Sequence, residues 1–314
     1  MKVEGGNLAA QRPATGGGRR AVIAIPYLWL LVFFLLPFLV VARISVSPME
    51  ATAVGDIVSW RDGSLAFDLR WQTYALLFTD DLYLSTYLAS LKYAGVTTVL
   101  CLGIGYPFAY FMARARRSVQ PALLMLVMMP FWTSFLLRVY AWKALLSERG
   151  LAEQAIGALG ADQVLAALGL IPGPGQLMNT PFSLVLGMTY TYLPFMILPL
   201  YAHLSKMDLQ LLEAASDLGA SAWTAFWTVT VPLSRPGVIA GSMLVFIPCV
   251  GEYVIPELLG GPQTQMIGRT LWDEFFSNND WPMACAVAVT MILLVIVPIA
   301  VFSRNQGDAS PRGT

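Results

Sequence analysis

Six long apolar segments run through this chain, and their length restricts what it can fold into. A helix needs about 20 apolar residues to cross the hydrocarbon core of a bilayer. The segments span residues 21–41, 93–113, 121–137, 181–202, 236–253 and 283–302. Of the 314 residues 57% are apolar and only 12% are charged, whereas a soluble protein carries about 25% charged residues. The pattern predicts an all-α membrane protein with six transmembrane helices.

Composition argues against several function classes. The formal net charge is zero, so the basic excess typical of a nucleic-acid-binding protein is missing. His203 is the only histidine, and Cys101, Cys249 and Cys285 each fall inside an apolar segment without a CxxC pair. We therefore expect buried free cysteines and no metal site of the common His/Cys type. The spans also lack the cluster of titratable groups that a membrane-embedded enzyme would need.

The distribution of Lys and Arg gives the orientation. With the N-terminus inside, the inner segments hold eleven Lys and Arg against five Asp and Glu, as the positive-inside rule requires. The cluster Arg114, Arg116 and Arg117 is the clearest marker. The first segment follows Arg19 and Arg20 like a secretory signal, but it is too long for one. We predict a cytoplasmic disordered tail over 1–20, a transmembrane domain over 21–303 with a cytoplasmic loop at 205–235, and a cytoplasmic tail over 304–314.

The outer segments between the spans are also expected to contain helices. Residues 71–78 and 82–91 look amphipathic and are predicted to lie along the membrane interface. Residues 152–169 are predicted to form a short helix before the turn IPGPG.

The inner loop between the fourth and fifth spans is short, polar and broken. Asp208 is placed to cap a helix, and Gly219 suits the left-handed residue that ends one. Ser221 is placed to cap a second segment, which we expect to stop before Pro232, and Ser234 then caps the fifth span. An amphipathic loop on the bilayer surface is the alternative, although an anionic leaflet attracts Lys and Arg rather than acidic residues.

This loop resembles the EAA signature of inner-membrane permease subunits of binding-protein-dependent ABC importers. The matching residues are Glu213, Ala214, Ala215, Gly219, Val229, Val231 and Pro232. Val229 and Val231 stand where the signature has Ile and Leu. The resemblance implies the type I (MetI-like) permease fold. It also implies that Glu213, Ala214, Ala215, Gly219 and Pro232 couple the chain to an ATPase.

Three further stretches, residues 130–146, 190–202 and 241–276, are similar to the polyamine branch of that family, and most strongly to permeases of putrescine importers. Related branches carry spermidine, opines or other amines. The resemblance implies a multi-pass protein of the bacterial inner membrane with both termini in the cytoplasm. Its implied partners are a dimer of ATPase subunits, a second homologous permease, a periplasmic binding protein and membrane lipid, with no nucleic acid. It implies no enzyme activity and no cofactor in this chain.

The sequence agrees with the implied binding of ATP by a separate subunit, because it lacks a nucleotide-binding motif. The chain has no GxxxxGK sequence, so it lacks a P-loop for ATP. ATP and Mg²⁺ would be bound by the separate ATPase subunit.

Ionisable groups at membrane depth are candidates for a substrate pathway. Glu252 and Glu257 lie in the sequence GEYVIPELLGG, where Pro256 is expected to break the helix between them. Aromatic faces attract ammonium groups, which adds four candidates: Trp132, Tyr190, Tyr192 and Tyr253. Each also fits the simpler role of a helix anchor at the membrane interface.

Two readings other than an ATP-driven importer stay open at this stage. An ATP-independent channel or facilitator for organic cations would not need the EAA-type loop, because the membrane potential already favours cation entry by about 2.3 kcal/mol per charge per 100 mV. A scaffold subunit would depend on packing glycines such as Gly237 and Gly241, which form a GxxxG sequence. That sequence is equally suited to contact with a second subunit and to packing within this chain.

Overall fold

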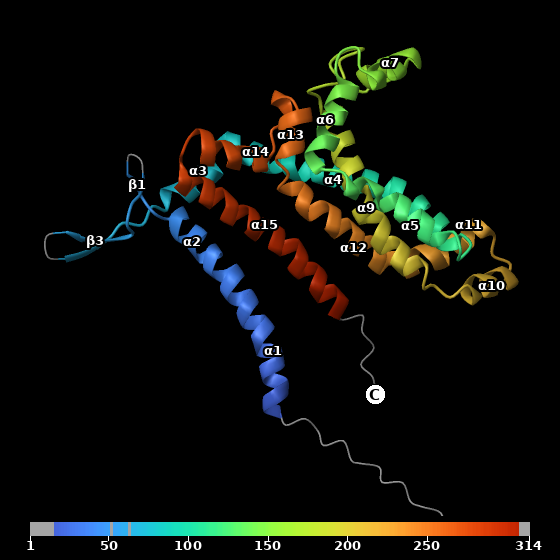
Figure 1. Ribbon diagram of the computed structural model, residues 1–314, viewed down its shortest axis with the longest axis horizontal. Helices are drawn as coiled ribbons and strands as arrows, with labels where there is room; N and C mark the ends of the chain where they lie inside the picture. Colours follow the sequence, from blue (N-terminus) through green and yellow to red (C-terminus); the bar gives the residue numbers. More distant parts are fainter. Residues whose placement is uncertain (1–15, 51–52, 62–63, 308–314) are drawn as a thin grey trace, which may run out of the picture.

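Most of the described residues are helical, and the long helices of the core lie side by side. The computed structural model describes residues 16–50, 53–61 and 64–307 (Figure 1). The long or central helices are α1 (Gly16–Leu30), α2 (Leu36–Ser45), α4 (Asp81–Arg114), α5 (Gln120–Met128), α6 (Phe135–Leu146), α9 (Pro181–Leu204), α12 (Val231–Val250) and α15 (Trp281–Gly307). The short ones are α3 (Gln72–Thr79), α7 (Leu151–Ala158), α8 (Ala161–Ala167), α10 (Gln210–Asp217), α11 (Ala222–Ala225), α13 (Val254–Leu259) and α14 (Ile267–Trp272).

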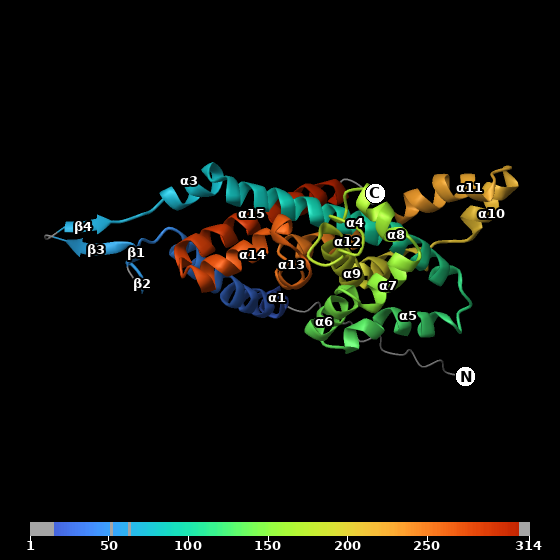
Figure 2. The ribbon, with the colours of Figure 1, turned by 90° about the horizontal axis from the view of Figure 1, so that it is seen from above.

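The strands form two small antiparallel hairpins at one end of the molecule. β1 (Met49–Glu50) pairs with β2 (Ala53–Val54), and β3 (Val58–Arg61) pairs with β4 (Ser64–Phe67). Both views show them near α3, while α10 and α11 lie at the opposite end (Figures 1 and 2). The predicted inner loop and the largest predicted outer segment thus lie at opposite ends of the bundle.

The core forms where α9 packs against both α4 and α12. Leu184, Met188, Met196 and Leu200 of α9 are fully buried, at the spacing of multiples of four that places residues on one helix face. Cys101 of α4 and Cys249 of α12 belong to the same cluster. All three cysteines are buried and free, as expected.

The apolar lengths support several membrane crossings. Within the residues that the structure describes, four helical stretches are long and apolar enough to cross a bilayer: Val22–Ser45, Asp81–Arg114, Pro181–Leu204 and Ala222–Val250. The third predicted span is a bent pair, and the described side chains of α15 give a shorter apolar stretch, Trp281–Ile296. The first stretch stays helical through a wider π-type turn at Leu31–Leu35, and its α2 portion lies beside α15.

The second span differs from the prediction, because it starts at Asp81 rather than Tyr93. Residues 82–91 do not lie along the membrane interface but form the first turns of α4. Their polar side chains face other helices: the Tyr87 hydroxyl donates to the Val287 carbonyl at 2.8 Å, and the Ser90 hydroxyl accepts from the Ile267 amide at 2.8 Å. The amphipathic pattern therefore marked a buried interface.

The third span, predicted as one helix, is broken. Its two halves, Gln120–Trp132 and Phe135–Leu146, meet at 86°. Pro130 lies in a short 3₁₀ turn, Met129–Trp132, and Thr133 is extended. A proline removes one backbone donor and clashes with the preceding turn, which explains why the helix ends there. α6 consequently leaves the direction of the bundle (Figure 1).

The stretch predicted as one helix at 152–169 is also two helices, α7 and α8. Gly160 adopts φ +67° between them, a left-handed conformation that glycine accepts without a steric penalty.

The glycines of the GxxxG sequence pack within this chain. A Cβ on Gly237 would lie 2.9 Å from the His203 Cβ, and one on Gly241 would lie 2.8 Å from the Met196 Sδ and 3.1 Å from its carbonyl oxygen. His203 and Met196 both belong to α9. The close approach therefore joins α12 to α9 rather than to another subunit.

Replacing Gly241 with alanine should destabilise the protein by about 1–3 kcal/mol, because the added methyl overpacks the contact between α9 and α12. Thermal unfolding of the detergent-purified chain measures this as a lower Tm. Gly103→Ala is the matched control, since no heavy atom lies within 4 Å of its added Cβ. Equal Tm values for the two variants would contradict the packing argument.

Candidate functional site

The inner loop is built from two capped helical segments. Asp208 Oδ1 accepts a hydrogen bond from the Gln210 amide at 3.0 Å, at the start of α10. Gly219 adopts φ +85° after α10, and Ser221 caps α11 by accepting from the Thr224 amide at 3.2 Å. These three predictions about the loop's local geometry are confirmed.

The predicted stop at Pro232 is wrong. The chain stays helical from Ala222 to Val250. A π-type turn at Phe226–Thr230 precedes Pro232, and local π adjustments can re-satisfy the backbone groups that a proline frees. Ser234 does not cap a helix. Its hydroxyl donates to the Val231 carbonyl at 3.0 Å and forms a hydrogen bond with the Tyr106 hydroxyl at 2.9 Å.

Aromatic contacts fix this loop to the bundle. The Phe226 ring lies edge-on to Tyr106 and Tyr110 of α4, with both centroid distances 5.8 Å. Because α11 continues into α12, the loop is joined to α12 through the backbone and to α4 through Phe226.

The loop projects an apolar surface that the described chain does not cover. Leu209, Leu211, Leu218, Trp223 and Trp227 are exposed, with Leu218 at 89%. Glu213, Ala214 and Gly219 are exposed as well, whereas Ala215 and Pro232 are half-buried. Leu209, Leu212, Ala215 and Leu218 follow one another at helical spacing, but only Leu212 and Ala215 turn partly inward, while Leu209 and Leu218 stay exposed. Apolar side chains with interspersed acids are typical of a surface that docks on another protein.

Glu252 lies at a second helix break, between the end of α12 and the start of α13. Its Oε1 accepts from the Val254 amide at 3.1 Å and from the Ile255 amide at 3.4 Å, so it caps α13. Its Oε2 accepts from the hydroxyl of the buried Tyr192 on α9. Of the predicted pathway residues, the structure thus brings Glu252 and Tyr192 together.

The predicted break at Pro256 is wrong. Pro256 lies in the first turn of α13, where its missing amide costs no intrahelical hydrogen bond. Instead, α12 ends at Val250, five residues beyond the fully buried Val245. The next helix, α13, begins at Val254, where Glu252 supplies the cap.

Glu257 and Tyr253 are held by α14 and do not join Glu252. Glu257 Oε2 forms an ion pair with Arg269 Nε at 2.8 Å. The Tyr253 ring stacks on Trp272 at 4.4 Å. Glu257 is thereby charge-compensated, while no cation pairs with Glu252 among the described residues.

Trp132 and Tyr190 lie at the other break, between α5 and α6. Tyr190 packs edge-on against Trp142 of α6 at 5.4 Å, and Trp132 is 70% exposed at the corner. Phe131 beside it lies edge-on to Phe195, whose ring lies 6.1 Å from Tyr192. A chain of aromatic rings therefore connects the two breaks across α9.

Sequence reasoning missed Phe131 and Phe195 as members of this chain, and Arg269 as the partner of Glu257. Proline placement offered a signal for Phe131, because it directly follows Pro130. No local pattern pointed to the other two.

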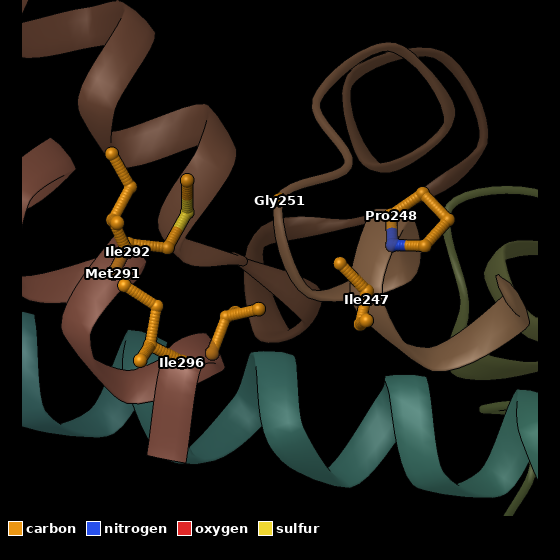
Figure 3. Close-up of a pocket in the computed structure, with 7 residues that line it drawn as sticks. Ile247, Pro248, Gly251, Met291, Ile292 and Ile296 are labelled. Carbon is orange, nitrogen blue, oxygen red and sulfur yellow. The ribbon is translucent and has the colours of Figure 1, made fainter. Parts of the chain in front are cut away.

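An apolar cavity of about 370 Å³ opens between α12 and α15, next to the second break. Figure 3 shows Ile247 and Pro248 on the α12 side and Met291, Ile292 and Ile296 on the α15 side. Gly251 also lines it, one residue before Glu252. A smaller cavity of about 150 Å³ lies beside the first break and includes Pro130, Tyr190 and Pro194. Neither cavity has a charged side chain among the residues that line it in the described part of the chain, and Glu252 directly follows Gly251 of the larger one.

Comparison with known proteins gives the family. The model of the binding-protein-dependent transport system inner membrane component matches residues 101–303. The chain belongs to this permease family. The permease is 36% identical over 288 residues to the spermidine/putrescine transport system permease protein PotB of Haemophilus influenzae, covering 91% of this chain and 93% of that protein. It is also 36% identical over 276 residues to PotB of Escherichia coli, covering 88% and 93%.

A solved structure supports the fold. The permease shares a TM-score of 0.62 with a chain of a bacterial alginate ABC transporter, solved in complex with a periplasmic protein that holds an alginate pentasaccharide. The match covers 95% of the permease and 96% of that chain at 14% identity. The expected fold class is therefore confirmed: an all-helical membrane protein similar to ABC importer permeases. It is a multi-pass inner-membrane subunit of a binding-protein-dependent importer and not itself catalytic.

Proposed function

We propose that the permease carries a polyamine, with putrescine the first candidate, from the periplasm to the cytoplasm. The observation that carries this proposal is the Glu252 carboxylate, which lies at a helix break without a cationic partner among the described residues. Two relatives at 36% identity are named as spermidine/putrescine permeases, which supports the same substrate class.

The surroundings of Glu252 favour a cation. The C-terminal end of α12 carries a partial negative charge from the helix dipole, and Glu252 follows it directly. Discontinuous helices whose ends face a pathway are a known device for ion and substrate sites in transporters. The rings of Tyr192, Phe195 and Phe131 add aromatic surface, which attracts ammonium groups weakly enough to allow release.

Transport itself is mechanical in this proposal. A periplasmic binding protein delivers the amine to the outer end of the permease. ATP, bound with Mg²⁺ by a separate dimer of ATPase subunits, closes that dimer against the loop containing Glu213, Ala214, Ala215 and Gly219. Phe226 and the continuous helix 222–250 pass the movement to α4 and α12. Pro232 lies in this connection, and hydrolysis returns the pathway to face inward.

The assembly follows from the same proposal. A second homologous permease completes the pathway, lipid surrounds the pair, and both termini lie in the cytoplasm. This chain needs no cofactor of its own. The tails predicted at 1–20 and 304–314 lie largely outside the described residues, although α1 starts at Gly16 and α15 continues to Gly307.

Uptake in proteoliposomes tests this function. The permease is reconstituted with its ATPase, second permease and binding protein, and labelled putrescine, spermidine and ornithine, an amino acid whose carboxylate offsets one of its two ammonium groups, are compared. We expect ATP-dependent uptake of the two polyamines and little uptake of ornithine. Equal uptake without ATP would instead support an ATP-independent facilitator for organic cations, and uptake of neither polyamine would contradict the substrate class.

A further inference from the structure

Three arginines lie close together in sequence at the short turn between α4 and α5. Arg114 is the last residue of α4, and Arg116 and Arg117 follow it before α5 begins at Gln120. All three are exposed, and neither of the two ion pairs found among the described residues includes them. Residues 82–147 contain no Asp or Glu, so the adjoining parts of the chain supply no acid to offset these charges.

Hydrogen bonds fix the backbone of this turn at the level where the spans end. The Arg116 carbonyl accepts from the Val119 and Gln120 amides at 2.8 Å and 3.3 Å. The Gln120 side chain donates to the Ala115 carbonyl at 3.1 Å, and its oxygen accepts from the hydroxyl of Tyr201, in the last turn of α9, at 3.1 Å. Three apolar helices thus reach the same level, and the headgroups of a bilayer lie where its spanning helices end.

Exposed apolar side chains border the arginines on both sides. Phe108 and Phe111 precede them on α4, and Val119, Met125 and Leu126 follow them at the start of α5 and along it. On a helix that crosses a bilayer, such side chains suit contact with acyl chains. Apolar surface that ends in a group of cations therefore matches a phospholipid from its tails to its phosphate.

The start of α5 adds to the positive charge. No side chain among the described residues caps its first amides, and the N-terminal end of a helix carries a partial positive charge that attracts phosphate. The Arg114 guanidinium lies over the Tyr110 ring, with its Cζ 5.1 Å from the ring centroid. A guanidinium can bind a phosphate through two parallel hydrogen bonds, so the turn offers both charge and donors.

We propose that the turn between α4 and α5 binds the phosphate of an anionic phospholipid. Both views place this turn at the same end of the bundle as α10 and α11 (Figures 1 and 2), so the lipid belongs to the leaflet on that side. Arg114, Arg116 and Arg117 contact the headgroup, and the exposed apolar side chains of α4 and α5 contact the acyl chains. Binding needs only this chain and the lipid, and it does not depend on the transported substrate.

Thermal unfolding with added lipid measures this binding. The full-length chain is purified in a nonionic detergent and heated with phosphatidylglycerol or with phosphatidylcholine, whose ammonium group offsets its phosphate. We expect phosphatidylglycerol to raise the Tm more at equal concentration, because a ligand that binds the folded state stabilises it. Equal shifts with the two lipids would overturn the proposal. An equal shift with inorganic phosphate would also overturn it, since that anion has no acyl chains.

Substitution locates the site. Combining Arg116→Gln with Arg117→Gln should weaken the apparent affinity for phosphatidylglycerol about 25-fold, since each basic residue at an anionic surface contributes about 1 kcal/mol, or about fivefold. Combining Lys206→Gln with Arg235→Gln is the matched control. It removes two exposed cations beside the ends of α9 and α12 and should leave the affinity unchanged. Each Tm shift is measured against the same variant without lipid, so a change in folding stability does not enter. Equal losses in the two double variants would contradict a site at the turn.

Photocrosslinking separates lipid from protein as the occupant. Benzoylphenylalanine is placed at the exposed Ser118 in the complete transporter, which is illuminated in membranes that contain phosphatidylglycerol. We expect a covalent product with that lipid. A product with an ATPase subunit in its place would show that the turn docks on protein, and the proposal would fail.

Discussion

A valine at position 219 should reduce ATP-driven uptake about tenfold, because a β-branched residue resists the left-handed conformation by about 1–2 kcal/mol or more. Gly219 adopts φ +85° between α10 and α11. No heavy atom lies within 4 Å of the position that a Cβ would occupy, so the substitution strains the backbone without a clash. We expect α10 to tilt away from α11 while the membrane bundle folds normally.

Two measurements distinguish this effect from a loss of protein. Uptake is divided by the amount of permease in the membrane, and ATP hydrolysis of the complex is followed in parallel. Gly160→Val is the matched control, since Gly160 has φ +67° and equally free surroundings but lies in the α7–α8 pair. If both variants transport alike, the angle between α10 and α11 does not govern coupling.

The helix caps and the turn of the inner loop could be predicted from the sequence because they depend on local interactions. Asp208, Gly219 and Ser221 act on backbone groups within three residues of themselves, so their residue types were enough to predict the caps and the turn. The continuation of the helix through Pro232 could not be predicted from the sequence, because the π-type turn before it packs against two tyrosines of α4. Such contacts arise only once the helices are assembled.

The difference between local interactions and contacts between assembled helices also explains why the second and third spans were predicted incorrectly. Tyr83, Thr86, Tyr87 and Ser90 read as the polar face of a surface helix, yet all four are buried. Their hydroxyl groups find acceptors or donors on neighbouring helices or on the preceding turn of α4. In the third span, no charged residue marks the corner at Thr133 and Ser134, and two hydroxyl side chains in an apolar segment cannot place an 86° bend.

The sequence indicated single candidate residues of the pathway but not which of them contact one another. Glu252 stood out as an acid at the end of an apolar segment. Its contact with Tyr192 joins residues 60 positions apart, and nothing in either local sequence predicts it. For the same reason Glu257 looked equivalent to Glu252, until Arg269 was found to neutralise it.

Glu252→Gln should weaken uptake of a diamine roughly thirtyfold, since a hydrogen bond from an ammonium to a charged acceptor is worth about 2 kcal/mol. Glutamine keeps an oxygen that can accept from the Val254 and Ile255 amides, and it can still pair with the Tyr192 hydroxyl. The cap of α13 is therefore retained while the negative charge is lost. We expect the apparent KM for putrescine to carry most of the change.

Glu274→Gln provides the matched comparison. Like the half-buried Glu252, the buried Glu274 accepts from a tyrosine hydroxyl across helices, that of Tyr83 at 2.7 Å, and its other oxygen accepts from the Asn278 amide nitrogen at 2.9 Å. It differs from Glu252 in lying away from both helix breaks, against the start of α4. Loss of uptake in Glu252→Gln alone would locate the cation's counter-charge at the break after α12. Equal losses would mean that both carboxylates support folding and that the amine is held by other groups.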